Sequence, residues 1–258
     1  MITKKQFSLI KEKAQKFKYN SFTYLEYGLC KQSVIISDNQ NLILLLSKSG
    51  DRLTAHFAYD EIEFLTERLG EIKGRVQINF VPKDHKENLK GIGFGELAEF
   101  ADFANKNLCA ANKAPAGLTG ITFLKYEESE YASMITEACA MQSRGFWGEE
   151  AGFFREWMNE KNDIIAEIID EKPVGLCCVA IINEGSTLWV RELAVLPEFQ
   201  NKGIGSKLLG QAVRYGVFHK ATKGFLMVDL LNDNAIHLYN KHGFFRRGEE
   251  TELQMIRE

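Results

Sequence analysis

A glycine loop between an apolar run and an amphipathic segment constrains this chain more than any other stretch. The run Leu188–Val195 is followed by Pro197, and the segment that Gly203 and Gly205 then open has apolar residues at helical spacing, namely Ile204, Leu208, Ala212 and Tyr215. This pattern predicts a strand, a loop and a helix. Glycines let a ligand approach the backbone closely, and the first N–H groups of a helix have no partner within it. We therefore expect the loop to bind a phosphate or pyrophosphate.

Two common phosphate-binding loops match this stretch only weakly. A P-loop needs a lysine directly after its second glycine and then a hydroxyl residue, whereas Gly205 is followed by Ser206 and Lys207 in the reverse order. A dinucleotide-binding loop needs a third glycine, and Leu208 stands in that place. The kind of phosphate ligand has to be inferred from the wider pattern.

The wider pattern resembles the coenzyme A loop of the GNAT acyltransferase superfamily. The loop Gln200-x-x-Gly203-x-Gly205 follows Glu192-Leu193-Ala194-Val195-x-Pro197. A predicted strand over 225–230 then leads into Asn232-x-x-Ala235-x-x-Leu238-Tyr239-x-Lys241-x-Gly243-Phe244, which resembles the second motif of the same family. The two motifs in this order are far more specific than the glycine pattern alone, and the resemblance covers about residues 118–258.

This resemblance implies an α/β fold in which a mixed, mostly antiparallel sheet is flanked by helices, with acetyl-CoA as co-substrate and no metal. It further implies that the loop amides bind the pyrophosphate and that the preceding strand pairs with the pantetheine arm as with an added strand. The residues implied at the cofactor are Leu193, Ala194, Val195, Gln200, Asn201, Lys202, Gly203, Ile204, Gly205, Ser206 and Asn232.

Tyr239 and Glu192 are the candidate catalytic residues. Tyr239 stands where the resemblance implies a phenol that protonates the departing sulfur; alternatively, it is a structural tyrosine packed on the sheet. Glu192 interrupts an apolar row of alternate residues on its strand, and burying an unpaired carboxylate is costly. It therefore has a partner or faces the cleft, so a general base and a structural ion pair both remain open.

The predicted function is acetyl-CoA-dependent acetylation of a primary amine on a small molecule or a protein. Residues 149–172 hold eight acidic and three basic side chains, which would attract a cationic acceptor if they lined the cleft and are otherwise a solvated rim. The alternative function is a non-catalytic acyl-CoA-binding or sensing protein.

An internal similarity divides the chain in two. Residues 74–94 and 224–244 both contain a predicted strand, a polar turn, a short helix and Gly-Phe, and in both the second glycine stands nineteen positions after the first. The first copy lacks the glycine loop and has Leu89 at the position of Tyr239. Residues 1–115 are therefore either a degenerate GNAT-like α/β domain or a similar segment by chance, and residues 116–258 are the acetyltransferase domain.

Periodicity and turn residues also predict the other elements. We expect helices at 4–17, 60–69 (capped by Asp60), 84–90, 129–141 and 146–161, with a short helix or strand within 20–31. We expect strands at 34–37, 41–47, 52–58, 75–81, 120–126, 164–169, 174–182 and 187–195.

Composition limits the class of protein, its partners and its cellular compartment. An apolar content of 45% and a charged content of 26% are typical of a globular protein, and the net charge of −3 gives no electrostatic case for a nucleic-acid partner. The five cysteines include no C-x-x-C, and the histidines are scattered, so we expect buried thiols and no metal site. No apolar stretch approaches twenty residues and no signal peptide is recognised, so we expect a cytoplasmic protein without a membrane partner.

Overall fold

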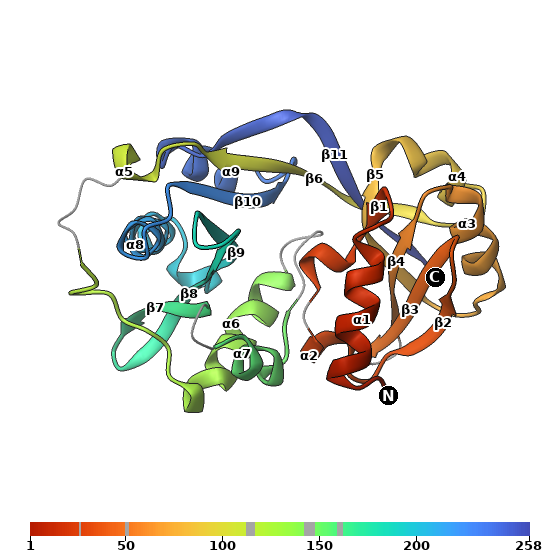
Figure 1. The fold of residues 1–258 in the computed structure, drawn as a ribbon. Coiled ribbons are helices and arrows are strands. Elements are labelled where there is room, and N and C mark those ends of the chain that lie inside the picture. Colours follow the sequence, from red (N-terminus) through yellow and green to blue (C-terminus); the bar gives the residue numbers. More distant parts are fainter. Residues whose placement is uncertain (26, 50–51, 112–116, 142–147, 159–161) are drawn as a thin grey trace. The chain divides into compact units, whose positions relative to one another are not determined.

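The chain folds into two compact units. The computed structural model describes residues 1–25, 27–49, 52–111, 117–141, 148–158 and 162–258. Unit 1 comprises Met1–Phe100 and Glu250–Glu258, and unit 2 comprises Ala101–Glu249 (Figure 1). The predicted boundary near residue 115 lies outside the described residues.

Unit 1 is built on a mixed sheet in the order β2-β3-β4-β5-β11. β2, β3 and β4 form an antiparallel meander, β5 runs parallel to β4, and β11 runs antiparallel to β5. Its strands are β1 (Tyr19–Asn20), β2 (Val34–Asp38), β3 (Leu42–Ser49), β4 (Arg52–Tyr59), β5 (Val76–Pro82), the first part of β6 (Gly95–Asn105) and the last part of β11 (Phe245–Arg257). Its helices are α1 (Lys4–Ala14), α2 (Tyr27–Cys30), α3 (Ile62–Glu71) and α4 (Lys86–Lys90), with 3-10 turns at Phe22–Tyr24 and Lys83–His85.

Strands β4 and β5 of unit 1 pair over a short distance and then separate. Residues 53–55 pair with residues 76–78, and no further β4–β5 pair follows in the described chain. Beyond that point β1 pairs with the end of β4, Tyr19 opposite Tyr59 and Asn20 opposite Ala58. The other edge of β4 is occupied by β3 at the same two residues. A strand has two edges, so β1 lies on the edge that β5 leaves.

Unit 2 repeats this plan, with the strand order β6-β10-β9-β8-β7. β7, β8 and β9 form the predicted antiparallel meander, and β10 runs parallel to β9. The strands are β7 (Asn162–Ile169), β8 (Lys172–Ile182), β9 (Thr187–Val195) and β10 (Lys223–Asp229), together with the parts of β6 and β11 in this unit. The helices are α5 (Leu108–Ala111), α6 (Ser129–Ala140), α7 (Ala151–Trp157), α8 (Ile204–Phe218) and α9 (Asp233–Lys241), with 3-10 turns at Tyr126–Glu128 and Pro197–Phe199.

The internal similarity seen in the sequence is a repeat of structure. In unit 1 the amide of Phe94 donates to the carbonyl of Leu89 at 3.1 Å, and in unit 2 the amide of Phe244 donates to that of Tyr239 at 3.0 Å. The glycine before each phenylalanine has a positive φ, a conformation that glycine adopts without the usual strain. Because the two turns share this hydrogen bond and this glycine, Leu89 occupies in unit 1 the turn position that Tyr239 occupies in unit 2.

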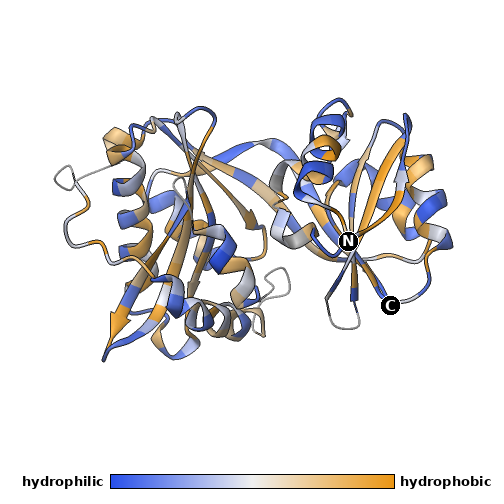
Figure 2. Ribbon diagram, turned by 60° about the horizontal axis from the view of Figure 1, so that its bottom comes forward, coloured by the Kyte–Doolittle hydropathy of each residue, from blue (hydrophilic) through white to orange (hydrophobic). Residues whose placement is uncertain are grey.

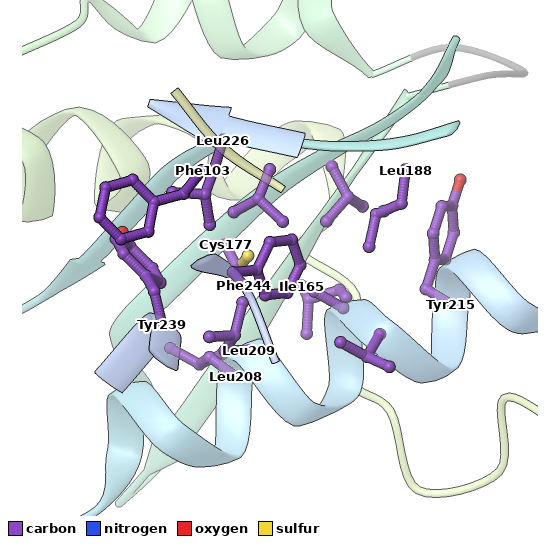
Figure 3. Packing of buried hydrophobic residues seen from close by; sticks show 14 of the residues in the cluster. Phe103, Ile165, Cys177, Leu188, Leu208, Leu209, Tyr215, Leu226, Tyr239 and Phe244 are labelled. Carbon is purple, nitrogen blue, oxygen red and sulfur yellow. The ribbon is translucent and has the colours of Figure 1, made fainter. Parts of the chain in front are cut away.

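The core of unit 2 lies between the sheet and α8. Hydrophobic residues concentrate on the strands, whereas the helices alternate polar and apolar residues along their length (Figure 2). Leu208, Leu209 and Ala212 on α8 are fully buried and pack with Leu188 and Cys177 of the sheet (Figure 3). Burying one leucine side chain contributes about 1.5–3 kcal/mol, so α8 is held chiefly by this face. This packing fixes the N-terminus of α8 at the end of β9.

Three sequence predictions need correction. Residues 120–126 form no strand; Phe123 makes one isolated bridge to Ile165, and Gly120 has a positive φ that interrupts an extended chain. Asp60 does not cap α3, since its carboxylate instead accepts the backbone N–H of Lys18 at 2.7 Å. The predicted helix at 146–161 is shorter, because α7 spans only seven residues; positions 146–147 and 159–161 lie outside the described residues.

The other predicted strands and helices are confirmed, with ends shifted by a few residues. Strands β6 and β11 were not anticipated. Across the portions of the chain that the structure describes, every helix is too short or too polar to traverse a bilayer.

Candidate active site

The loop between β9 and α8 is shaped by two residues in the left-handed region. Asn201 has φ 60° and Gly203 has φ 84°, which glycine and asparagine tolerate best. The side-chain amide of Gln200 donates to the carbonyl of Val195 at 3.0 Å. The loop is thereby tied back to the end of β9, and its next residues lead directly into the helix.

The backbone amides of this loop are available to a ligand. Within the described chain, no hydrogen bond is found from the backbone N–H groups of residues 201–206, and Lys207 is the first to donate, to Gly203 at 3.0 Å. The start of α8 has no side-chain cap. These amides lie at the positive end of the helix dipole, so they fit an anion such as a pyrophosphate.

The end of β9 has an open edge beside these amides. β10 pairs with β9 only from Thr187 to Trp189, whereas β8 pairs with β9 along its whole length. No described strand pairs with the second edge of Leu193, Ala194 or Val195. Side chains of Gln200 and Cys139 donate to the carbonyl of Val195 at 3.0 and 3.3 Å, so the main-chain groups left on this edge lie among those of Leu193 and Ala194 and the N–H of Val195. An extended ligand can therefore add to this edge by main-chain hydrogen bonds, which is what the resemblance to the GNAT superfamily implies for the pantetheine arm.

Two further polar side chains predicted at the cofactor, Ser206 and Asn232, make local hydrogen bonds. Ser206 Oγ lies 2.9 Å from Nε2 of His242, and burial together with the charge of Lys241 lowers the pKa of this histidine. Asn232, predicted at the cofactor, caps α9 by accepting the amide of Ala235 at 3.1 Å. Its side-chain NH2 group is not needed for that bond. His242 was not predicted, since a lone histidine carries no motif.

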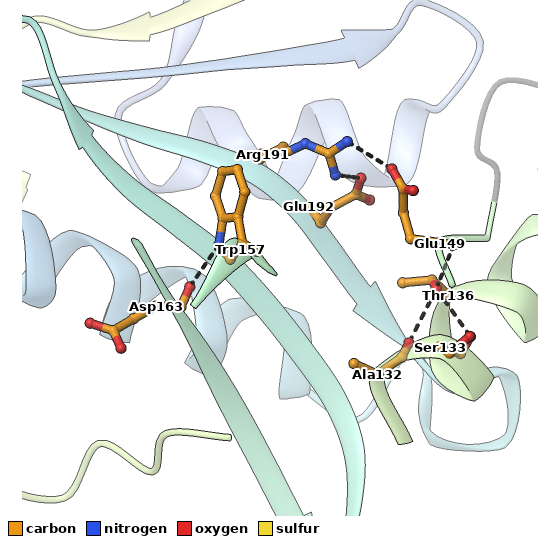
Figure 4. Close-up of polar contacts among 8 residues, drawn as sticks. All are labelled: Ala132, Ser133, Thr136, Glu149, Trp157, Asp163, Arg191 and Glu192. Atoms are coloured by element: carbon orange, nitrogen blue, oxygen red, sulfur yellow. Dashed lines mark hydrogen bonds and ion pairs between the residues drawn. The ribbon is translucent and has the colours of Figure 1, made fainter. Parts of the chain in front are cut away.

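A β-bulge in β9 brings two adjacent charged side chains together. Cys178 pairs with Glu192 and Val179 pairs with Val190, so Arg191 is an extra residue between them. Neighbouring side chains in a regular strand point to opposite faces, whereas a bulge changes their direction. Arg191 Nη1 consequently lies 2.5 Å from Glu192 Oε1 (Figure 4).

Arg191 also binds a second carboxylate. Its Nη2 lies 2.7 Å from Glu149 Oε1, just before α7 (Figure 4). The guanidinium carbon lies 4.2 Å from the ring centre of Phe153 and 5.6 Å from that of Trp157. Side chains of Arg191, Glu149 and Glu192 are each no more than 10% exposed. One buried cation is thus shared by two carboxylates and held over aromatic rings.

The environment of Glu192 makes it a stronger base than an ordinary carboxylate. Burial raises the pKa of Glu192 to about 7; Arg191 opposes this rise and Glu149 adds to it. Only Oε1 is bound by Arg191, and no hydrogen bond to Oε2 is found in the described part of the chain. Of the two alternatives, the structure thus gives Glu192 a partner while leaving one oxygen free.

Tyr239 lies at the end of the core cluster nearest the start of α8 (Figure 3). The side chain is 8% exposed, and the described residues provide no hydrogen-bond partner for its hydroxyl. Burial raises the pKa of Tyr239, and the charges of Cys177 and Glu192 raise it further. The phenol therefore keeps its proton at neutral pH and lies within electrostatic reach of Glu192.

The acidic stretch does not gather into one cluster. Glu167 pairs with Lys207 at 2.6 Å, and Asp163 accepts the hydroxyl of Tyr215 at 2.9 Å. Of the described residues in this stretch, Glu149 joins the site, through Arg191. The one sequence feature that could have pointed to Glu149 is Arg191, because a charged residue inside an apolar run needs an acidic partner. Within the described ranges, no group of three or more histidine, cysteine, aspartate or glutamate side chains is placed to hold a metal ion.

The fold and site of unit 2 define a GNAT-type domain, in which a splayed pair of parallel strands opens beside an uncapped glycine loop. Residues 131–244 match the family model of the acetyltransferase (GNAT) family. Residues 131–244 of unit 2 are therefore a GNAT-family domain.

Spermidine N(1)-acetyltransferase of Escherichia coli K12 is 33% identical to the chain over 81 residues, which are 31% of this chain and 44% of that protein. The match therefore spans less than half the length of this curated relative.

Solved structures show the same two-unit fold. A Drosophila protein aligns with a TM-score of 0.60 at 14% identity, covering 99% of this chain and 96% of the other. A tandem GNAT protein from the clavulanic acid biosynthesis pathway aligns with a TM-score of 0.58 at 11% identity, covering 83% and 77%. A putative GNAT acetyltransferase from Novosphingobium aromaticivorans aligns with a TM-score of 0.55 at 15% identity, covering 87% and 91%.

Proposed function

We propose that unit 2 is an N-acetyltransferase that transfers an acetyl group from acetyl-CoA to a primary amine. The observation that carries the proposal is the separation of β9 from β10 after Trp189. It leaves an open strand edge beside the unbonded amides of residues 201–206. A ligand with an extended amide-containing arm and a pyrophosphate fits both features.

Acetyl-CoA, when bound, supplies an activated acetyl thioester. The amides of Asn201 to Ser206 would hold its pyrophosphate, and the edge of Leu193 to Val195 would align its arm. The side chain of Gln200 holds the loop closed against β9 through Val195. These contacts would place the thioester near the core end of β9, where Glu192 and Tyr239 lie.

Glu192 and Tyr239 would perform the proton transfers. An alkylammonium has a pKa near 10.4, so only roughly one part in a thousand is nucleophilic at neutral pH. Glu192 would take a proton from the ammonium on its free oxygen, which leaves a neutral amine to attack the carbonyl carbon. Tyr239 would donate its proton to the sulfur as the carbon–sulfur bond breaks, and the phenolate would then recover a proton from the new amide nitrogen.

The charge of the site favours a cationic acceptor. The carboxylates of Glu149 and Glu192 lie on one guanidinium, and acidic groups beside the thioester would attract an ammonium. The E. coli relative is named for spermidine, which makes polyamines the first acceptors to test. Amino acids, aminoglycosides and protein amino groups have the same reactive group.

The proposal includes a cytoplasmic location. The five cysteines are all free, which suits a reducing compartment.

The test combines binding and turnover. Isothermal calorimetry with acetyl-CoA and with free CoA would measure binding. Thiol release would then be followed against spermidine, an aminoglycoside, free amino acids and a peptide with a free amino terminus. Binding with turnover on at least one amine, lost in Glu192→Gln, is expected. Binding without turnover on any amine would instead favour an acyl-CoA sensor, and no binding would overturn both.

A further inference from the structure

The buried cluster around Arg191 is larger than an ion pair for Glu192 requires. Glu149 reaches the same guanidinium from the segment before α7, and its backbone N–H donates to Thr136 Oγ1 of α6 at 3.1 Å (Figure 4). Three elements therefore converge to hold a second carboxylate beside the first. A structural role alone would be met by Arg191 and one carboxylate.

The two neighbours of Glu192 act on it in opposite directions. A guanidinium close to a carboxylate favours its charged form and makes it a weaker base. Here Arg191 does so, but Glu149 and burial favour the protonated form. The charge of Glu149 thus offsets part of the charge of Arg191, and Glu192 keeps an affinity for protons near neutral pH.

The other titratable groups near Glu192 are neutral in this range. Burial raises the pKa values of the thiols Cys177 and Cys178 on β8 and of Cys139 on α6, and Glu192 contributes to each rise. The pKa of Tyr239 on α9 is raised in the same way. Among the described residues, the charges that act on Glu192 are accordingly those of Arg191 and Glu149.

We propose that Arg191 and Glu149 are positioning residues for Glu192, which hold it in place and keep it able to accept the proton of the acceptor ammonium. Arg191 binds Oε1 and leaves Oε2 for that proton. Glu149 balances the charge of Arg191. In the step itself one N–H bond of the ammonium breaks and one O–H bond forms on Oε2, which gives a neutral amine and a carboxylic acid. This inference rests on the proposed function.

The first experiment is the pH dependence of kcat/KM for the full chain with its best amine. Glu149→Gln keeps the size and hydrogen-bonding groups of the side chain and removes its charge. We expect the acidic limb of the profile to move to lower pH by about one unit or more, because Arg191 then acts on Glu192 alone. Glu149→Asp should restore part of the shift. Glu130→Gln, which removes the partner of Arg155 at 2.6 Å on the same unit, should leave the limb unchanged.

Arg191→Lys tests the positioning role. A lysine keeps the charge but lacks the planar fork that binds two carboxylates at once. We expect kcat to fall at least about tenfold while the Kd of acetyl-CoA stays within about twofold. Equal losses in rate and donor affinity would show that Arg191 only supports the fold.

A measurement on the unmodified sequence protects the test from variants that fail to fold. Carbon-13 NMR of glutamate carboxyls, with Glu192→Gln for assignment, would follow the titration of Glu192 without turnover. Titration near pH 7 is expected, and titration at an ordinary carboxylate value would overturn the inference. An unchanged limb in Glu149→Gln, with Glu192→Gln inactive, would also overturn it while leaving the proposed function intact. If no amine is acetylated, the proposed function is wrong. The NMR titration would still show whether Glu192 binds a proton near pH 7.

Discussion

At the scale of single residues, the two units differ at one equivalent turn position, which is Leu89 in unit 1 and Tyr239 in unit 2. Leu89 and Tyr239 accept the same turn hydrogen bond in their respective units, and both are buried. A leucine in that place is the cheaper solution for packing, because a buried phenol normally needs a hydrogen-bond partner. The hydroxyl of Tyr239 has no hydrogen-bond partner among the described residues and is not sealed off from solvent, so it is free to donate its proton to a ligand.

Tyr239→Phe tests this explanation. We expect kcat to fall about 100-fold or more, the usual size of a general-acid contribution, with little change in the Kd of acetyl-CoA. Stopped-flow thiol release and calorimetry would measure the two quantities. Tyr215→Phe is the matched control, since it removes a hydroxyl bound to Asp163 elsewhere in the same unit. A loss of affinity as large as the loss of rate would contradict the acid role.

The pH dependence of stability belongs to the same scale. The folded-state pKa of Glu192, about 7, exceeds its ordinary value of 4.5, so the folded protein binds more protons than the unfolded chain between these values. The contribution of Glu192 to the free energy of unfolding therefore decreases as pH rises through this window. Glu192→Gln should become more stable relative to the parent protein at pH 8 than at pH 5.

Urea unfolding at the two pH values would measure this difference. Glu198→Gln, which changes an exposed carboxylate, should show no such trend. A Glu192→Gln variant whose relative stability is the same at both pH values would contradict the raised pKa.

At the scale of elements, the sequence predicted best where one local rule decides the structure. The meander over 162–195 and the helix after Gly203 follow from periodicity and turn residues. The segment 120–126 has the apolar residues of a strand but no continuous neighbour to pair with, which a local pattern cannot reveal. The bulge at Arg191 could not be predicted either, because a bulge is defined by the register between two strands. For the same reason the contact between Arg191 and Glu149 was not predicted.

Gly203→Glu is the prediction for the loop. No atom lies within 4 Å of the position that a Cβ would take, and the φ of 84° is unfavourable for other residues. We expect a modest loss of stability, about 1–2 kcal/mol, and loss of acetyl-CoA binding through charge repulsion at the pyrophosphate. Gly185→Glu is the matched control, because Gly185 also has open space and a φ of 91° but lies in the β8–β9 turn. Calorimetry that finds donor binding intact in Gly203→Glu would disprove the pyrophosphate site.

At the scale of the whole molecule, the two units are not consecutive pieces of chain. Residues 250–258 return to unit 1, where Leu253 and Met255 are fully buried with Ile78. Residues 101–105 enter unit 2, where Ala101 and Phe103 join the core. The sequence indicated a repeat but did not predict that each end strand crosses between the units. Linker composition identifies flexible connections, whereas this chain passes between the units on strands β6 and β11. Dividing the chain near residue 115 would therefore separate Ala101 and Phe103 from the core of unit 2, and it would separate residues 250–258 from the rest of unit 1.

The repeat raises the question of how many donor molecules one chain binds, and the structure predicts one. In unit 1 the strand edge equivalent to that of Leu193–Val195 is already paired with β1. The connection from β4 to α3 is only Asp60 and Glu61, whose charges would repel a pyrophosphate at the helix start. Both features that fit the donor in unit 2 are therefore absent from the described part of unit 1. Calorimetry of the full chain with CoA should give a stoichiometry near one, and Gly203→Glu should leave no residual heat. A stoichiometry near two, or a residual site in that variant, would show that β1 can be displaced and that unit 1 has kept a site of its own.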